Sequence, residues 1–199
     1  MTYDTFLMVD WSGGNDRGPT PKKDAIWVCA ARKGTADEPV YMRNRQVAEA
    51  WILDFLKTER AAGRRVLAGF DFAFGYPVGF GRTLTGSDDP FALWQWMTDR
   101  IKDSPKANNR FDVAAQINTL FDGIGPFWGN GLNRDIAHLP RKGLDRRDHG
   151  MPEKRAAEKH AKGAFPVWQL SGAGAVGGQV LMGLPTLNRL RQAFLPDVA

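Results

Sequence analysis

The periodicity of apolar residues predicts three strands, a helix and a fourth strand within the first 77 residues. Short apolar runs at residues 5–10, 25–32 and 39–45 have the length and composition of strands. From residue 46 to residue 63 the spacing becomes helical, through Val47, Ala48, Trp51, Ile52, Phe55 and Leu56. Residues 64–71, "RRVLAGFD", are apolar on both faces, as expected of a buried central or parallel strand.

After the Gly-Tyr-Pro turn at residues 75–77 the pattern becomes helical and irregular. Helices are predicted at residues 87–103, with Ser87 as the N-cap, and at residues 110–123. A Gly- and Pro-rich stretch follows, and then a short exposed helix at residues 153–163, a fifth strand at 165–170 and a last helix at 180–194, interrupted or kinked near Pro185. The prediction is one α/β domain over residues 1–199, with a helical and basic insertion at about 86–163.

Composition narrows the class of protein. The chain has 199 residues, 43% of them hydrophobic and 25% charged, which is ordinary for a globular domain. No stretch approaches the roughly 20 apolar residues that span a bilayer, and no signal-peptide pattern opens the chain. The one cysteine, Cys29, excludes an internal disulfide. We therefore expect no membrane partner and a cytoplasmic location, and the sequence predicts no particular oligomeric state.

The net charge of +5 is unevenly distributed. Residues 134–162 hold nine Lys and Arg against five Asp and Glu, and they also contain all three histidines, His138, His149 and His160. Such a segment suits a polyanion such as nucleic acid or a nucleotide phosphate, although a solvated surface has the same composition.

Two carboxylates follow predicted strands. Asp10 ends the first strand, and Asp71 ends the fourth in the middle of "VLAGFDFAFGYP". If these strands are parallel neighbours, both acids lie at the carboxyl edge of the sheet, where open α/β sheets bind ligands. Two acids there repel unless a cation holds them, which favours Mg²⁺ or Mn²⁺ and metal-assisted phosphodiester cleavage. Glu49, near the start of the first helix, is a candidate third catalytic acid, but favourable interaction with the helix dipole also explains it.

These residues carry a family resemblance. The order β-β-β-α-β with Asp10, Glu49 and Asp71 resembles the ribonuclease H-like fold, with a mixed sheet. The phrases "VDWSGG" and "GFDFAFGYP" are similar to the predicted nucleases of domain-of-unknown-function family 429, a branch of that fold. The resemblance implies a metal-dependent hydrolase. Ribonuclease H-like nucleases usually have a further acid near the last helix. This sequence lacks it, because no Asp or Glu occurs between Phe165 and Pro196.

Two glycine-rich loops suggest alternative functions. "DWSGGN" resembles the Asp and Gly-rich hairpin that actin-like proteins and sugar kinases place at ATP phosphates, which makes Ser12 and Gly13 candidate substrate contacts. Gly172, Gly174 and Gly177 have the spacing of a dinucleotide fingerprint, although no acid follows about 20 residues later. Trp11 and Tyr76 are the aromatic residues nearest to Asp10 and Asp71 in sequence, and we expect them to line the site. A nucleotide- or cofactor-binding protein and a non-catalytic member of the fold therefore remain alternatives to a nuclease.

Overall fold

The computed structural model describes residues 2–198, which form two compact units. The sheet unit contains residues 2–71 with 104–107, and the helical unit contains residues 72–103 with 108–198. We describe each unit by itself.

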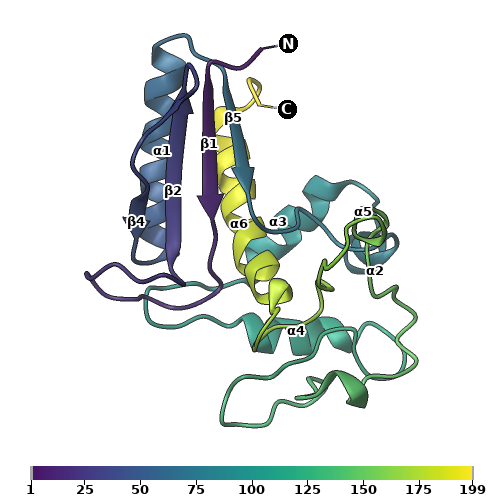
Figure 1. Ribbon diagram of the computed structural model, residues 1–199. Coiled ribbons are helices and arrows are strands. Elements are labelled where there is room, and N and C mark those ends of the chain that lie inside the picture. The colour runs from purple at the N-terminus through teal and green to yellow at the C-terminus, as the bar shows by residue number, and fades with distance from the viewer. Residues whose placement is uncertain (1, 199) are drawn as a thin grey trace. The chain divides into compact units, whose positions relative to one another are not determined.

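The sheet unit is built on a mixed sheet, which confirms the predicted α/β class. β1 (Thr5–Asp10) pairs antiparallel with β2 (Ile26–Arg32), and β2 also pairs with β3 (Thr35–Ala36) and β4 (Val40–Met42). On its other side β1 pairs with β5 (Val66–Phe70), and these two strands run in the same direction (Figure 1). The two-residue strand β3 is too short for a periodic signal and was not predicted.

Helix α1 (Arg45–Ala61) lies along one face of this sheet (Figure 1) and connects β4 to β5. Asn44 caps it, because the Asn44 side chain accepts a hydrogen bond from the Val47 amide at 2.9 Å. Ala48 and Ile52 are fully buried, as the predicted apolar stripe requires, whereas Val47 is 42% exposed. In β1 the alternate residues Thr5, Leu7 and Val9 are buried, while Phe6 and Met8 stay exposed on the opposite face.

A buried carboxylate holds the other end of α1 to the sheet. The side chain of Glu59 is 1% exposed and accepts hydrogen bonds from Thr5, Arg32 and Arg64. These hydrogen bonds, with that from Arg64 the largest cause, hold the pKa of Glu59 far below its usual range in spite of the opposing effect of burial. The cluster joins β1, β2, α1 and the turn that follows α1.

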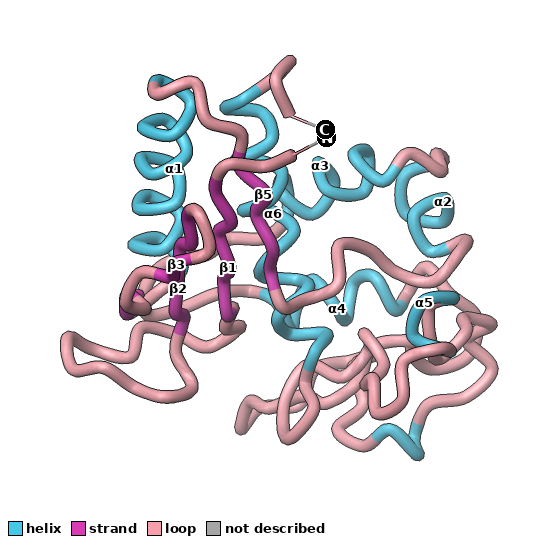
Figure 2. The backbone as a smooth tube through the Cα atoms, turned by 45° about the horizontal axis from the view of Figure 1, so that its top comes forward, coloured by secondary structure: helices cyan, strands magenta, loops and turns pink. Residues whose placement is uncertain are grey.

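The helical unit contains helices connected by long loops (Figure 2). Its elements are α2 (Phe80–Thr85), α3 (Pro90–Arg100), α4 (Arg110–Asn118), η1 (Gly143–Asp145), α5 (Ala156–Lys159) and α6 (Val176–Phe194). α6 packs against α3 and α4, and α2 packs against α3. The buried amide of Asn188 in α6 donates hydrogen bonds to Gln95 and Thr98 of α3, both at 3.0 Å. α6 is one helix with Pro185 inside it, so of the two predicted alternatives the interruption is absent, and a kink at Pro185 stays a prediction.

Three other predictions in this unit were wrong in detail. The N-cap of α3 is Asp89, whose side chain accepts from the Phe91 amide at 2.9 Å, and Ser87 lies outside the helix. Residues 165–170 form no strand, because their only ladder contact is an isolated bridge between Trp128 and Gln169. The helix predicted at residues 153–163 is reduced to the single turn of α5. Short apolar runs do not distinguish a strand from a packed loop.

An aromatic cluster forms part of the core of the helical unit. Tyr76 stacks against Trp168 with ring centroids 5.4 Å apart and contacts Phe80 and Phe127 at 4.2 and 5.7 Å. The Tyr76 hydroxyl is buried and has no hydrogen-bond partner among the described residues. Burial raises the pKa of Tyr76 well above its ordinary value.

We expect Glu59→Gln to lower the free energy of unfolding by about 2–3 kcal/mol at pH 7, because two guanidinium groups lose their charged acceptor. Since the folded-state pKa of Glu59 is lowered, its contribution is complete above the unfolded-state value near 4.5 and is lost as the pH falls below it. Urea unfolding at pH 7 and pH 3 measures this, with the exposed Glu38→Gln as control. An equal deficit of Glu59→Gln at both pH values would contradict the ionic role.

We expect Tyr76→Phe to raise the free energy of unfolding by about 1 kcal/mol, because it removes a buried hydroxyl that has no partner and keeps the ring stacking. The matched control is Tyr41→Phe, whose lost hydroxyl donates to the carbonyl of Gly18 at 2.9 Å, and which should lower stability by a similar amount. Urea unfolding of both variants checks the signs. A destabilised Tyr76→Phe would show that this hydroxyl is satisfied in solution.

Candidate active site

Asp10 and Asp71 lie side by side at the carboxyl ends of β1 and β5. The parallel register pairs Val9 with Phe70, so that the next residue of each strand is a carboxylate. The backbone extends this ladder, because the amide of Asp71 donates to the carbonyl of Val9 at 3.1 Å. The amide of Trp11 then donates to Oδ1 of Asp71 at 2.7 Å. The structure therefore brings together the two acids that the sequence singled out.

Like charge and partial desolvation act together on Asp10, which is exposed at the end of β1. Burial is the largest cause that raises the pKa of Asp10 above its ordinary value of 3.8. The charge of Asp71 and a side-chain hydrogen bond with Asp71 raise this pKa further, and the charge of Asp24 adds to them. The charged groups that raise this pKa, Asp71 and Asp24, are both acids, and Asp10 forms no ion pair with a Lys or Arg among residues 2–198.

Asp24 is an acid of this site that the sequence analysis missed. It lies just before β2, and the antiparallel register places Trp27 of β2 opposite Asp10. The beginning of β2 therefore lies beside the end of β1, which brings the charge of Asp24 toward Asp10. Only the pairing register of β1 and β2 places Asp24 near Asp10. The polar sequence of the loop between these strands does not predict this placement.

The loop that follows β1 is fixed by several hydrogen bonds. Trp11 is buried, and Oγ of Ser12 accepts from the amide of Gly14 at 3.1 Å across Gly13. Farther along, Asp16 accepts hydrogen bonds from Nε and Nη2 of Arg43, and others from the Asn44 side chain and the Gly18 amide. These hydrogen bonds, with those from Arg43 the largest cause, lower the pKa of Asp16 to about 2. Trp11, Ser12 and Gly13, which the sequence analysis named as candidate substrate contacts, thus directly follow Asp10 of the candidate site.

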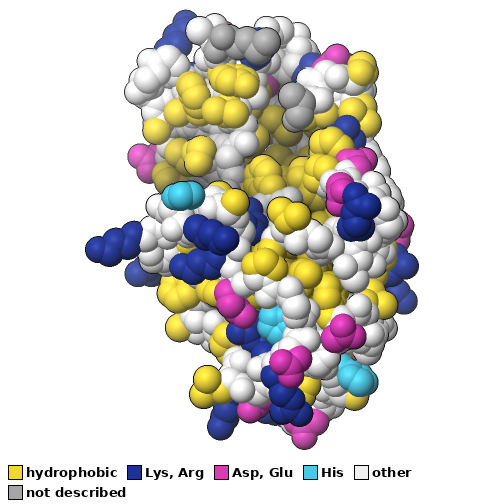
Figure 3. Space-filling view, turned by 90° about the vertical axis from the view of Figure 1, so that its right-hand side faces the viewer, with side chains coloured by type: hydrophobic (Ala, Val, Ile, Leu, Met, Phe, Trp, Pro, Cys, Tyr) yellow, Lys and Arg dark blue, Asp and Glu magenta, His cyan; other side chains and the backbone are white. Residues whose placement is uncertain are grey.

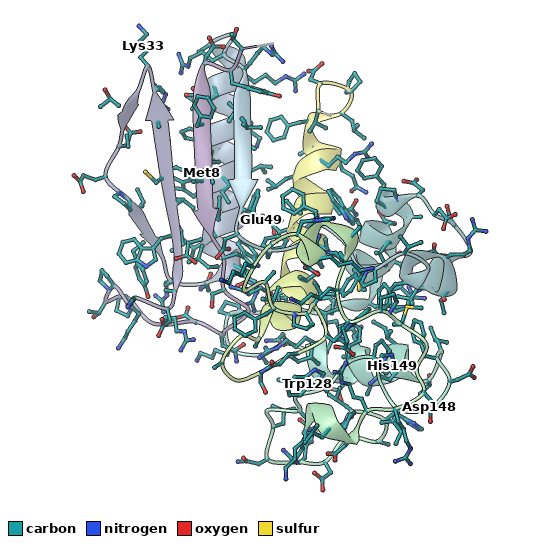
Figure 4. The ribbon with its side chains drawn as sticks, turned by 45° about the vertical axis from the view of Figure 1, so that its right-hand side comes forward. Met8, Lys33, Glu49, Trp128, Asp148 and His149 are labelled. Carbon is teal, nitrogen blue, oxygen red and sulfur yellow. The ribbon has the colours of Figure 1, made fainter. Side chains whose placement is uncertain are left out.

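Glu49 lies toward the end of the sheet unit that is opposite to Lys33 (Figure 4). It is half-buried in the second turn of α1. No group of three His, Cys, Asp or Glu side chains among residues 2–198 is close enough to hold a metal ion, so Glu49 does not complete a three-ligand cluster with Asp10 and Asp71. A catalytic role for Glu49 stays a prediction.

The second glycine loop belongs to the helical unit and serves close packing. Gly172 and Gly174 have φ values of 91° and 77°, a left-handed conformation that favours glycine. A Cβ at Gly177 would lie 2.5 Å from the carbonyl oxygen of Val167 and 2.7 Å from that of Gln169. Gly177 therefore allows α6 to approach the backbone of residues 167–169. Neither a strand nor a side-chain N-cap precedes α6, so the dinucleotide fingerprint lacks its expected context.

Most arginines of the basic segment are paired with acids within the helical unit. Ion pairs join Arg134 to Asp112, Arg141 to Asp135, Arg146 to Glu153, and Arg155 to Glu158. On the face that Figure 3 displays, Lys and Arg are interspersed with Asp and Glu. This arrangement is less favourable to a polyanion than the sequence count suggested.

Two of the three histidines of the basic segment, His149 and His138, have defined contacts. His149 lies with Trp128 and Asp148 in one region of the helical unit (Figure 4). Its Nδ1 accepts a hydrogen bond from the Met151 amide at 3.2 Å, and burial and then the charge of Arg146 lower its pKa. His138 is in the left-handed region, with φ at 65°, and its backbone carbonyl accepts from Asn118 at 2.7 Å. These contacts lie within the helical unit and give neither histidine a chemical role.

No family model, curated protein or solved structure matches this chain. The functional argument therefore depends on the geometry of the paired carboxylates.

Among the described residues, no helix combines the length and the apolar character needed to cross a bilayer.

We expect Asp10→Asn to raise the free energy of unfolding of the metal-free protein by up to about 1 kcal/mol at pH 7, the scale of partly exposed charge pairs. The folded-state pKa of Asp10 is raised, so the repulsion is present above that pKa and fades as the pH falls toward the ordinary value of 3.8. Urea unfolding in EDTA at pH 7 and pH 3.5 measures the gain, with the exposed Asp54→Asn as control. A loss of stability at pH 7 would show that Asp10 is compensated in solution.

Proposed function

We propose that the protein is a metal-dependent phosphodiesterase or nuclease with a ribonuclease H-like sheet, and that Asp10 and Asp71 bind its divalent cation. One observation carries the proposal: parallel strands β1 and β5 end in adjacent carboxylates, one of which has a raised pKa. Carboxylates at the carboxyl end of a parallel pair occupy the usual ligand-binding edge of an α/β sheet. The two carboxylates repel each other, and neither has an ion pair with a Lys or Arg among residues 2–198, so a bound metal would relieve this repulsion.

The donor set fits Mg²⁺ or Mn²⁺. Both are hard cations that prefer oxygen ligands, and Mg²⁺ usually keeps several waters while binding one or two carboxylates together with substrate phosphates. Two aspartates are therefore sufficient, and the absence of a three-acid cluster among residues 2–198 does not argue against this ion. The Trp11 amide holds Oδ1 of Asp71, which fixes the orientation of one ligand. When bound, the ion would supply charge stabilisation at the phosphate and activate a water.

The loop after β1 offers contacts to a phosphate. Ser12 and Gly13 follow Asp10 and Trp11 directly, and their backbone amides lie in a turn closed by Ser12 Oγ. Arg17 packs against the backbone of this turn, because a Cβ at Gly14 would lie 2.8 Å from its Nη2. Its exposed guanidinium has no hydrogen bond or ion pair with any residue in the range 2–198. A free cation beside a glycine turn suits a nucleic-acid or nucleotide phosphate.

We expect Mg²⁺- or Mn²⁺-dependent cleavage of at least one of three substrates: single-stranded DNA, RNA or bis(p-nitrophenyl) phosphate. Asp10→Asn and Asp71→Asn should each reduce kcat/KM by about 100-fold or more, because each removes a charged metal ligand. Asp54→Asn, which changes an exposed acid of α1, should retain activity.

Cleavage at the wild-type rate in both Asp10→Asn and Asp71→Asn would remove their assigned role. Cleavage that persists in EDTA would contradict metal dependence. Isothermal titration of wild-type protein with Mn²⁺, without substrate, tests the cation site separately from the reaction.

A further inference from the structure

Arg45 occupies a position that is unfavourable for a cation. It is the first residue of α1, where the positive end of the helix dipole repels a positive charge. It is also only 2% exposed, and burying a guanidinium carries a large desolvation cost. Charged residues are rarely fully buried unless other groups pair with them. The burial of Arg45 therefore requires compensating contacts.

Arg45 contacts the turn that follows β1. Its Nη1 donates to the carbonyl of Ser12 at 3.2 Å and also to the carbonyl of Gly14. These two carbonyls flank Gly13, so a single guanidinium nitrogen holds both ends of the glycine turn. A Ser-Gly-Gly sequence has high conformational freedom, and its fixed geometry therefore depends on such contacts.

The same turn fixes the Asp71 carboxylate. Trp11 directly precedes Ser12, and its amide donates to Oδ1 of Asp71 at 2.7 Å. The Trp11 ring is 1% exposed and meets Phe70 edge to face, with centroids 6.2 Å apart. A continuous path therefore leads from Arg45 through the Ser12 carbonyl and the Trp11 amide to Asp71, entirely within the sheet unit.

We infer that Arg45 is a positioning residue of the carboxylate pair: it fixes the turn at residues 12–14, so that the Trp11 amide holds the Asp71 carboxylate beside Asp10. This inference rests on the proposed function in so far as the pair binds a cation. Its structural part, the order of the Trp11 amide, does not depend on a metal. Groups that position metal ligands typically change affinity by 10–100-fold when they are removed.

The neighbouring residues act on a different part of the loop. Arg43 and Asn44 bind Asp16, two residues beyond Gly14, and the Arg17 amide donates to the Arg43 carbonyl at 2.9 Å. The side chains of Arg43 and Asn44, just before α1, thus hold the loop at Asp16, whereas Arg45 holds the part next to the acids. Glu49, four residues after Arg45, lies on the same face of α1 by helical spacing.

The test uses the full-length protein with Arg45→Met and Arg45→Lys. Methionine keeps the unbranched apolar part of the side chain without a donor, and lysine restores a charged donor with different geometry. The control is Glu59→Gln, which weakens the same unit at the opposite end of β1. Two quantities are measured: hydrogen exchange of the Trp11 amide in metal-free protein, and the Kd for Mn²⁺ by isothermal titration.

We expect Arg45→Met to speed exchange of the Trp11 amide by about tenfold or more relative to the Leu7 amide, and to raise the Kd for Mn²⁺ by about tenfold. Arg45→Lys should give intermediate values of both, still above those of the wild type, because its ammonium has a different donor geometry from the guanidinium. Glu59→Gln should leave the Mn²⁺ affinity and the ratio of the two exchange rates unchanged despite its lower stability.

Unchanged Trp11 exchange in Arg45→Met would overturn the inference, and so would an equal effect in Glu59→Gln. If Arg45→Met does not fold, Arg45→Lys decides: faster Trp11 exchange relative to Leu7 supports the inference, and a wild-type ratio overturns it. If the wild-type protein binds no Mn²⁺, the proposed cation site fails, while the exchange ratios still decide the positioning role.

Discussion

The parallel pairing of β1 and β5 is the constraint on which the candidate site depends. Five consecutive pairs, from Thr5 with Val66 to Val9 with Phe70, set the register. Because side chains alternate between the two faces of a strand, a slip of one residue would turn Asp71 toward the other face. Burial of Thr5, Leu7 and Val9 on the α1 side opposes such a slip. Packing on one face of the sheet therefore determines which carboxylates meet at its edge.

The two ends of the sheet unit shift the pKa of a carboxylate in opposite directions. At the amino end of β1, Glu59 is surrounded by Arg32, Arg64 and Thr5, and its pKa is lowered. At the carboxyl end, Asp10 has acids as its charged neighbours, and its pKa is raised. Glu59 accepts charged hydrogen bonds from two arginines, whereas neither Asp10 nor Asp71 forms an ion pair with a Lys or Arg in the part of the chain that the structure describes. That contrast is the physical reason for proposing a cation site at one end and a structural role for Glu59 at the other.

The sequence was informative where periodicity or position defines a residue's role. β1, β2, α1 and β5 follow from apolar spacing, and Asp10 and Asp71 stand out as acids at the ends of apolar runs. Asp24 and Arg45 could not be found in this way. Asp24 approaches Asp10 through the register of β2, and Arg45 is buried by its contacts with a turn 31–33 residues earlier. Charged residues in a loop or at a helix end are expected on the surface until tertiary contacts are known.

The strand predicted at residues 165–170 was wrong for the opposite reason. Val167, Trp168 and Leu170 are buried, as in a strand, but they are buried by packing and form no ladder.

The two glycine loops show why glycine spacing alone does not identify a phosphate site. At Gly177 the space of a side chain is taken by the carbonyl oxygens of Val167 and Gln169, whose partial negative charge opposes an anion. At Gly14 the corresponding space is taken by the guanidinium of Arg17, whose charge attracts one. Both glycines permit close approach, but the group that approaches has opposite polarity. The loop after β1 is therefore the better place for a phosphate, and it is the loop that begins at the paired carboxylates.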